Sequence, residues 1–128
     1  VSFSADYGET WTPARESNLP LSIAKPYCGV LSTGRRYLIG NSVNETNASR
    51  KYLTLALSRP GEEQLSTLYL VRDVQQSPSP AGDARMNHIC YPHAIEYKGF
   101  LYVVHSAGHG HNINNIDLAI VPLRELER

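Results

Sequence analysis

An octapeptide near the start of the chain, Ser4-Ala5-Asp6-Tyr7-Gly8-Glu9-Thr10-Trp11, constrains the fold more than any other stretch. Its form is Ser-x-Asp-x-Gly-x-Thr-Trp, and each fixed position suits a tight turn between two strands. Asp6 can accept hydrogen bonds from backbone N–H groups, and Gly8 can take the positive φ of a short hairpin connection. Thr10 is a β-branched strand former, and Trp11 offers a large apolar face for packing against a neighbouring sheet. The octapeptide therefore predicts a β-hairpin.

Most of the remaining periodic segments also favour β-strands, bounded by turn signals at Thr33-Gly34, Pro60-Gly61 and Lys98-Gly99. The expected strands cover residues 1–4, 10–15, 27–32, 36–43, 51–58, 65–71, 91–97, 100–105 and 116–121, and residues 123–128 form a terminal helical turn. Residues 44–50 and 74–89 have the polar composition of loops. Because no amphipathic helix of normal length is visible, the sequence predicts an all-β fold, either a propeller or a sandwich.

A weak internal repeat supports this prediction. The strand–turn–strand unit of Val30–Ile39 recurs at Ile95–Val104, with Gly34 matched by Gly99. The strands then group into an outer pair (1–15), a unit of four (27–73) and a unit of three (90–122). The sequence therefore contains two similar meanders in addition to the N-terminal hairpin.

Composition excludes several classes of function. With 12 basic and 12 acidic side chains the formal net charge is zero, so nothing favours nucleic acid or an acidic membrane as a partner. No run of about 18 apolar residues predicts a membrane-spanning helix. The two cysteines, Cys28 and Cys90, lie in apolar strand-like runs, which favours buried free thiols over a disulfide. No cofactor motif is present, and no feature indicates a cellular compartment.

The octapeptide resembles the Asp-box of the sialidase-like (BNR-repeat) β-propellers, in which the box closes a hairpin within a blade. From Lys25 onward the chain is similar to the C-terminal third of these propellers, through residues 25–39, 50–58 and 90–95. The resemblance implies blades of a six-bladed propeller: the outer pair 1–15, a full blade 27–73 and a last blade 90–122. Since about two blades cannot close a ring, it also implies a homo-oligomer, with three copies giving six blades, or a longer propeller.

The resemblance also implies the chemistry of a candidate site. Arg50 precedes a strand as one of the family's carboxylate-clamping arginines does, and an arginine can form a bidentate fork on a carboxylate. Tyr91 begins the following inner strand as the nucleophilic tyrosine does, but a neutral phenol needs a neighbouring base, and Glu96 lies five residues further along the strand. Tyr91 is thus the catalytic candidate and Arg50 a substrate-binding candidate.

All five histidines lie between His88 and His111. Tyr91 and His93 share one side of an expected strand, and His105 ends the adjacent hairpin arm, so both histidines are candidates for substrate binding. A zinc site using two histidines and Asp117 is an alternative, but the spacing matches no metal motif, which favours polar loops over a metal centre.

Three functions remain open at this point. The first is a sialidase-like exo-glycosidase acting on a carbohydrate, inactive as a lone chain because the acid/base aspartate of the family comes from a blade that this chain lacks. The second is a non-catalytic module that binds carbohydrate or protein. The third is a self-associating gene fragment without a selected activity.

Overall fold

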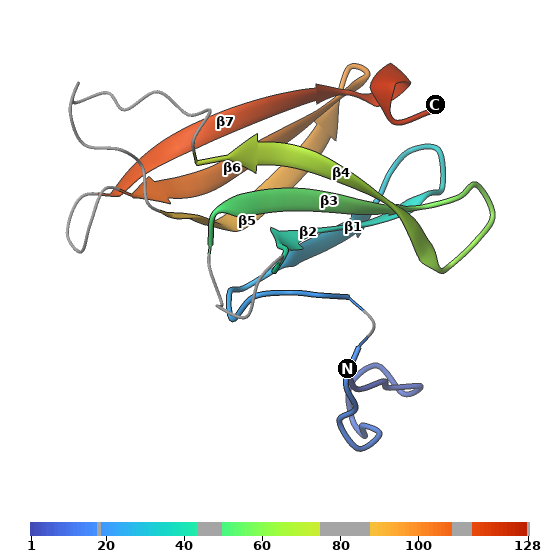
Figure 1. Ribbon diagram of the computed structural model, residues 1–128. Helices are drawn as coiled ribbons and strands as arrows, with labels where there is room; N and C mark the ends of the chain where they lie inside the picture. Colours follow the sequence, from blue (N-terminus) through green and yellow to red (C-terminus); the bar gives the residue numbers. More distant parts are fainter. Residues whose placement is uncertain (18, 44–49, 75–87, 109–113, 128) are drawn as a thin grey trace.

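The computed structural model describes residues 1–17, 19–43, 50–74, 88–108 and 114–127, and over these ranges it confirms the predicted all-β class (Figure 1). The strands are β1 (Tyr27–Val30), β2 (Arg36–Asn41), β3 (Tyr52–Ser58), β4 (Leu65–Asp73), β5 (His88–Tyr97), β6 (Phe100–Gly108) and β7 (Asn114–Pro122). A 3-10 helix, η1 (Leu123–Glu125), follows β7 at the place where the sequence predicts a helical turn.

The strands form two antiparallel meanders, with sheet orders β1-β2-β3-β4 and β5-β6-β7. Gly34 and Gly99, which the sequence repeat aligns, have nearly equal φ angles of 80° and 79° in the first turn of each meander. Both angles lie in the left-handed region that glycine occupies without a Cβ penalty. The two meanders therefore begin with related hairpins, as the repeat predicts.

The two sheets pack face to face around one core. Side chains from the facing sides of both sheets are almost fully buried, among them Ile39, Leu53, Leu55, Leu57, Ile89, Leu101 and Val103. Burial of these side chains supplies the main driving force for folding. Alternation along β2 and β3 places Ile39 and Leu55 on the core side and Leu38 and Ala56 on the other side.

A buried amide ties the sheets together beside the core. Asn41, at the end of β2 and 2% exposed, donates through Nδ2 to the Tyr52 carbonyl at 3.1 Å and to the Ile89 carbonyl at 2.7 Å. The first acceptor belongs to β3 and the second to β5. Asn41 thus fixes the start of β5 against the four-stranded sheet.

The N-terminal octapeptide forms the predicted turn. The Asp6 carboxylate accepts hydrogen bonds from the backbone N–H of Thr10 (2.9 Å), the Thr10 hydroxyl and the Ser4 hydroxyl (2.7 Å). These bonds stabilise the carboxylate and lower the pKa of Asp6 from 3.8 to about 2. Gly8 has φ 96°, as the turn requires.

The prediction of strands at Val1–Ser4 and Thr10–Arg15 is wrong for this structure. Residues 1–15 form a loose hairpin joined by backbone bonds such as Thr12 N–H to the Phe3 carbonyl, and no strand is assigned there. Figure 1 shows this segment projecting away from both sheets. A two-stranded hairpin without a neighbouring sheet is marginal in water. For the same reason Trp11 is 63% exposed rather than packed, and its indole N–H bonds the Gly8 carbonyl.

The cysteine prediction is half right. Both thiols are free, and Cys90 is buried, but Cys28 is exposed. Cys28 pairs with Leu38 on the side of the first sheet that faces away from the core. Its short apolar run therefore has only one buried side.

Candidate functional site

Arg50 lies between the two sheets, immediately before β3. Its carbonyl accepts the backbone N–H of Ile89 at 2.8 Å, which joins the chain entering β3 to the start of β5. The side chain then reaches Tyr91: Nη1 donates to the phenol oxygen at 3.1 Å, and the guanidinium carbon lies 5.1 Å from the ring centroid. The two residues that the sequence nominates for carboxylate binding and catalysis are therefore in direct contact.

A β-bulge in β5 makes this contact possible. The pairing of β5 with β6 is irregular between Cys90 and His93, and Tyr91 has φ 54°. Ile89 and Cys90 are consecutive buried residues, after which Tyr91 turns outward and is 48% exposed. Pro92 has no N–H to offer a ladder, and bulges tolerate such a residue.

The backbone of Tyr91 is strained. A side chain in the left-handed region costs about 1–2 kcal/mol, and a residue that precedes proline is itself restricted in conformation. Strain of this kind persists where the surrounding structure enforces it, and it clusters at functional sites. The bulge is thus an independent observation that singles out Tyr91.

The guanidinium of Arg50 is held by three contacts: Tyr91, the Cys90 sulfur at 3.7 Å and the Ile23 carbonyl at 3.1 Å through Nη2. The hydrogen bond with Tyr91 is the largest cause of a raised pKa of Arg50, which keeps the group charged. Its two remaining N–H donors have no partner among the described residues. A fixed, charged and partly open guanidinium of this kind can bind a carboxylate.

His93 is exposed like Tyr91, two residues further along β5. Its ring lies against Tyr27 of β1, with centroids 4.3 Å apart and an interplanar angle of 36°. Ring faces of this kind are suited to contact the apolar face of a sugar. His93 is therefore exposed near Tyr91 on β5 and in contact with Tyr27 of the first sheet.

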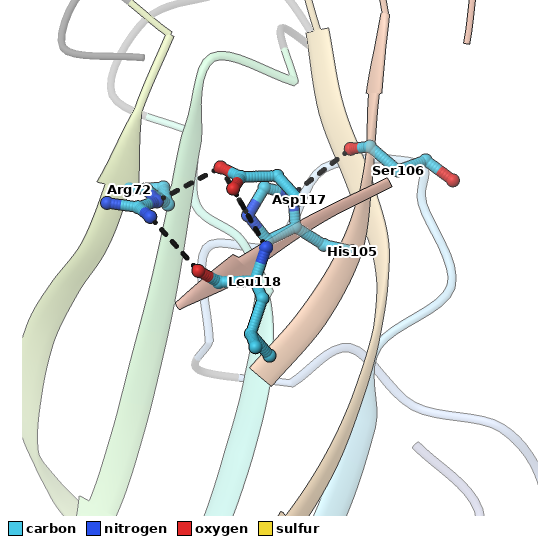
Figure 2. Close-up of polar contacts among 5 residues, drawn as sticks. All are labelled: Arg72, His105, Ser106, Asp117 and Leu118. Atoms are coloured by element: carbon cyan, nitrogen blue, oxygen red, sulfur yellow. Dashed lines mark hydrogen bonds and ion pairs between the residues drawn. The ribbon is translucent and has the colours of Figure 1, made fainter. Parts of the chain in front are cut away.

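The structure does not bring His105 to this surface. The side chain is fully buried between the sheets, where Nε2 lies 3.5 Å from Oδ2 of Asp117 and Nδ1 lies 3.2 Å from the Ser106 carbonyl (Figure 2). The same Asp117 oxygen pairs with Nε of Arg72 at 3.2 Å, and Arg72 also donates to the Leu118 carbonyl. Burial lowers the pKa of His105 from its ordinary value of 6.5, and the nearby Arg72 adds to this effect while Ser106 and Asp117 oppose it.

Glu96, the carboxylate considered beside Tyr91, is engaged elsewhere. It accepts hydrogen bonds from the backbone N–H of Ser32 at 2.7 Å and from the Ser32 hydroxyl. In the described part of the chain no hydrogen bond joins a carboxylate to the Tyr91 phenol. Among the described residues, the site therefore has a cation and a phenol but not the base that a phenol nucleophile needs.

Two contacts of the site escaped the sequence prediction. The Ile23 carbonyl comes from a segment without periodicity, which carried no signal. Tyr27 lies in a predicted strand, but its contact with His93 depends on how the two sheets pack, which no local pattern shows. The clusters of His, Cys, Asp and Glu within the described ranges include none suited to a metal ion, and the loop histidines His109 and His111 lie outside those ranges.

Comparison with protein-family models, with curated proteins and with solved structures finds no match to this chain. Within the described ranges, helical structure amounts to the short η1, so no helix there has the length and apolar character of a membrane span.

Proposed function

We propose that this chain is part of a six-bladed sialidase-like β-propeller and binds an acidic sugar through Arg50 and Tyr91. The observation that carries the proposal is the direct contact of these two side chains at a strained bulge. Arg50 supplies a fixed positive charge for the sugar carboxylate. Tyr91 supplies a hydroxyl and a ring beside it, and the Tyr27–His93 pair continues the surface.

The arrangement of the sheets supports the blade assignment. Each sheet is an up-and-down meander, and their first strands are neighbours, linked by the Tyr27–His93 contact and by the Ser32–Glu96 hydrogen bonds. In a propeller the first strands of successive blades line the central channel. On this assignment Tyr27, Tyr91 and His93 face the channel where a ligand would enter.

We further propose that hydrolysis requires additional blades. In a glycosidase with a tyrosine nucleophile, the phenol oxygen attacks the anomeric carbon while a base removes its proton and an acid protonates the leaving group. In this proposal Tyr91 is the nucleophile, but no described carboxylate is placed to act as its base. The lone chain should therefore bind without turnover, and activity should need blades supplied by other copies or by a longer polypeptide.

The engagement of Glu96 by Ser32 specifically favours the second candidate, a non-catalytic carbohydrate-binding module. In this case the Arg50–Tyr91 pair serves recognition alone. Both candidates share the same binding site, and they differ only in whether a bound sialoside is cleaved.

A titration of isotope-labelled protein with sialic acid, followed by NMR, tests the site. The expected shift changes centre on the Arg50 side-chain N–H and the amides of Tyr91 and His93, and Arg50→Ala removes them. Arg59→Ala is the matched control, because Arg59 is an exposed arginine in the β3–β4 turn. Shift changes centred elsewhere, or unaffected by Arg50→Ala, contradict the proposal.

Cleavage of a fluorogenic sialoside separates the two candidates. Turnover that Tyr91→Phe abolishes supports the glycosidase. Binding without turnover in an assembly of closed mass supports the non-catalytic module.

A further inference from the structure

The outward side of the β5-β6-β7 sheet carries an extensive apolar surface, here called the outer face. Its large side chains are Ile95, Tyr97, Phe100, Val104, Ile116, Leu118 and Ile120, each between 38% and 81% exposed. They are neighbours across the paired strands β5, β6 and β7, and monomers rarely expose contiguous apolar patches larger than a few hundred Å². A surface of this size indicates a protein partner.

The internal repeat shows what kind of surface fits the outer face. The repeat that matches Gly34 with Gly99 also matches Tyr37 of β2 with Tyr102 of β6, and Ile39 with Val104. Tyr37 and Ile39 face the core, with exposures of 6% and 0%, whereas Val104 is 38% exposed. The outer face is therefore the counterpart of a surface that is covered within the same chain.

Inside the chain, the side of the first sheet that carries Tyr37 and Ile39 is covered by the second sheet. The covering side includes the row Ala94, Val103 and Ala119, which runs across β5, β6 and β7 and is at most 5% exposed. From β5 across β6 to β7, the side chains of this row are small, large and small. It packs in the core cluster with Ile39.

The first sheet carries the matching row on its side away from the core. Cys28, Leu38 and Ala56 are paired across β1, β2 and β3, and Leu68 of β4 continues the row with 56% exposure. The row again reads small, large and small. In this row Cys28 is exposed and Leu38 is half-buried, whereas Ala56 is 5% exposed, so the row is open mainly at β1 and β4. Over the described residues, the outer face and this row each correspond to one half of the internal sheet-on-sheet contact.

We infer that the outer face of one copy binds the Cys28–Leu68 row of a second copy, which repeats the internal contact between chains. Because the two surfaces differ, the contact is heterologous, and it builds a ring where the rotation between copies closes and an open filament where it does not. The inference rests on the exposed sheet faces and does not depend on the proposed sugar site. Arg50 and Tyr91 are changed in none of the variants below.

Light scattering after gel filtration tests this inference with two single variants. Ile120→Lys places a charge on the outer face, and Leu68→Lys places one on the row. The wild-type chain should form a species that is a multiple of its 14.2 kDa mass, and each variant should be a monomer. Phe3→Lys, which changes an exposed side chain on the projecting N-terminal segment, should leave the assembly intact.

Mixing the two variants is the sharpest test. Ile120→Lys retains an intact row and Leu68→Lys retains an intact outer face, so an equal mixture should form a dimer at twice the chain mass. Circular dichroism confirms that each variant is folded. A monomeric wild type, which would leave the face to another protein or to further blades of a longer polypeptide, overturns the inference. So does an assembly that Leu68→Lys leaves unchanged, because this indicates an isologous contact of outer faces.

Discussion

Replacing Asn41 by alanine should weaken the whole fold although it removes no apolar contact from the core. The amide Nδ2 donates to the carbonyls of Tyr52 and Ile89 in a nearly water-free position. Leaving the buried Ile89 carbonyl without a donor costs about 1–3 kcal/mol, and losing the second bond costs about 1 kcal/mol more. The expected loss in the free energy of unfolding is therefore about 2–4 kcal/mol, or roughly 10 °C in Tm for a domain of this size.

Urea unfolding followed by backbone circular dichroism measures this loss. Tryptophan fluorescence is unsuitable, because Trp11 lies outside the core. Asn115→Ala is the matched control: Asn115 is exposed on β7, and its replacement should change stability by no more than about 0.5 kcal/mol. Since Ile89 lies two residues before the bulge, Asn41→Ala should also move the amide resonance of Tyr91. A loss no larger than that of the control refutes the role of Asn41 as the tie between the sheets.

Three further perturbations follow from individual groups. Burial lowers the pKa of His105, so the folded state favours the neutral ring; stability should fall as pH drops through 6.5, and His105→Gln should flatten the pH dependence of the urea midpoint. NMR titration should give Asp6 a pKa of about 2, and Thr10→Ala should raise that pKa. The hydrogen bonds of the turn should contribute their full stability above pH 3.8 and lose it as the pH falls through 2. An ordinary pKa of Asp6 in the wild type contradicts the turn. Lys98 has φ 47° before Gly99, so Lys98→Asn should raise stability by about 0.5–1 kcal/mol in thermal unfolding, and a decrease contradicts the assigned strain.

Much of the fold could be predicted because the relevant signals are local. Runs of strand-forming residues predicted β2, β3 and β6, and glycine turns marked the hairpins at Gly34 and Gly99. Such patterns depend on residues close in the chain, so they can be recognised without knowledge of tertiary contacts. The N-terminal strands failed because pairing there needs a neighbouring sheet, which no local pattern can supply.

The site was predictable only in part. Arg50 and Tyr91 were nominated by resemblance, and their contact depends on a bulge that has no sequence signal apart from Pro92. His105 was misplaced because a histidine ending a strand looks the same whether it faces solvent or an interior carboxylate. Asp117, which contacts the buried His105 ring, lies twelve residues away on β7. Arg72, which pairs with Asp117, comes from the other sheet.

The most direct test of the proposed site compares the affinities of wild type and Arg50→Ala for sialic acid and for its methyl ester. The acid should bind the wild type about fivefold more tightly than the ester, as expected for one partly exposed charge pair worth about 1 kcal/mol. In Arg50→Ala the acid and the ester should bind equally. A preference for the acid that persists in Arg50→Ala would contradict the site.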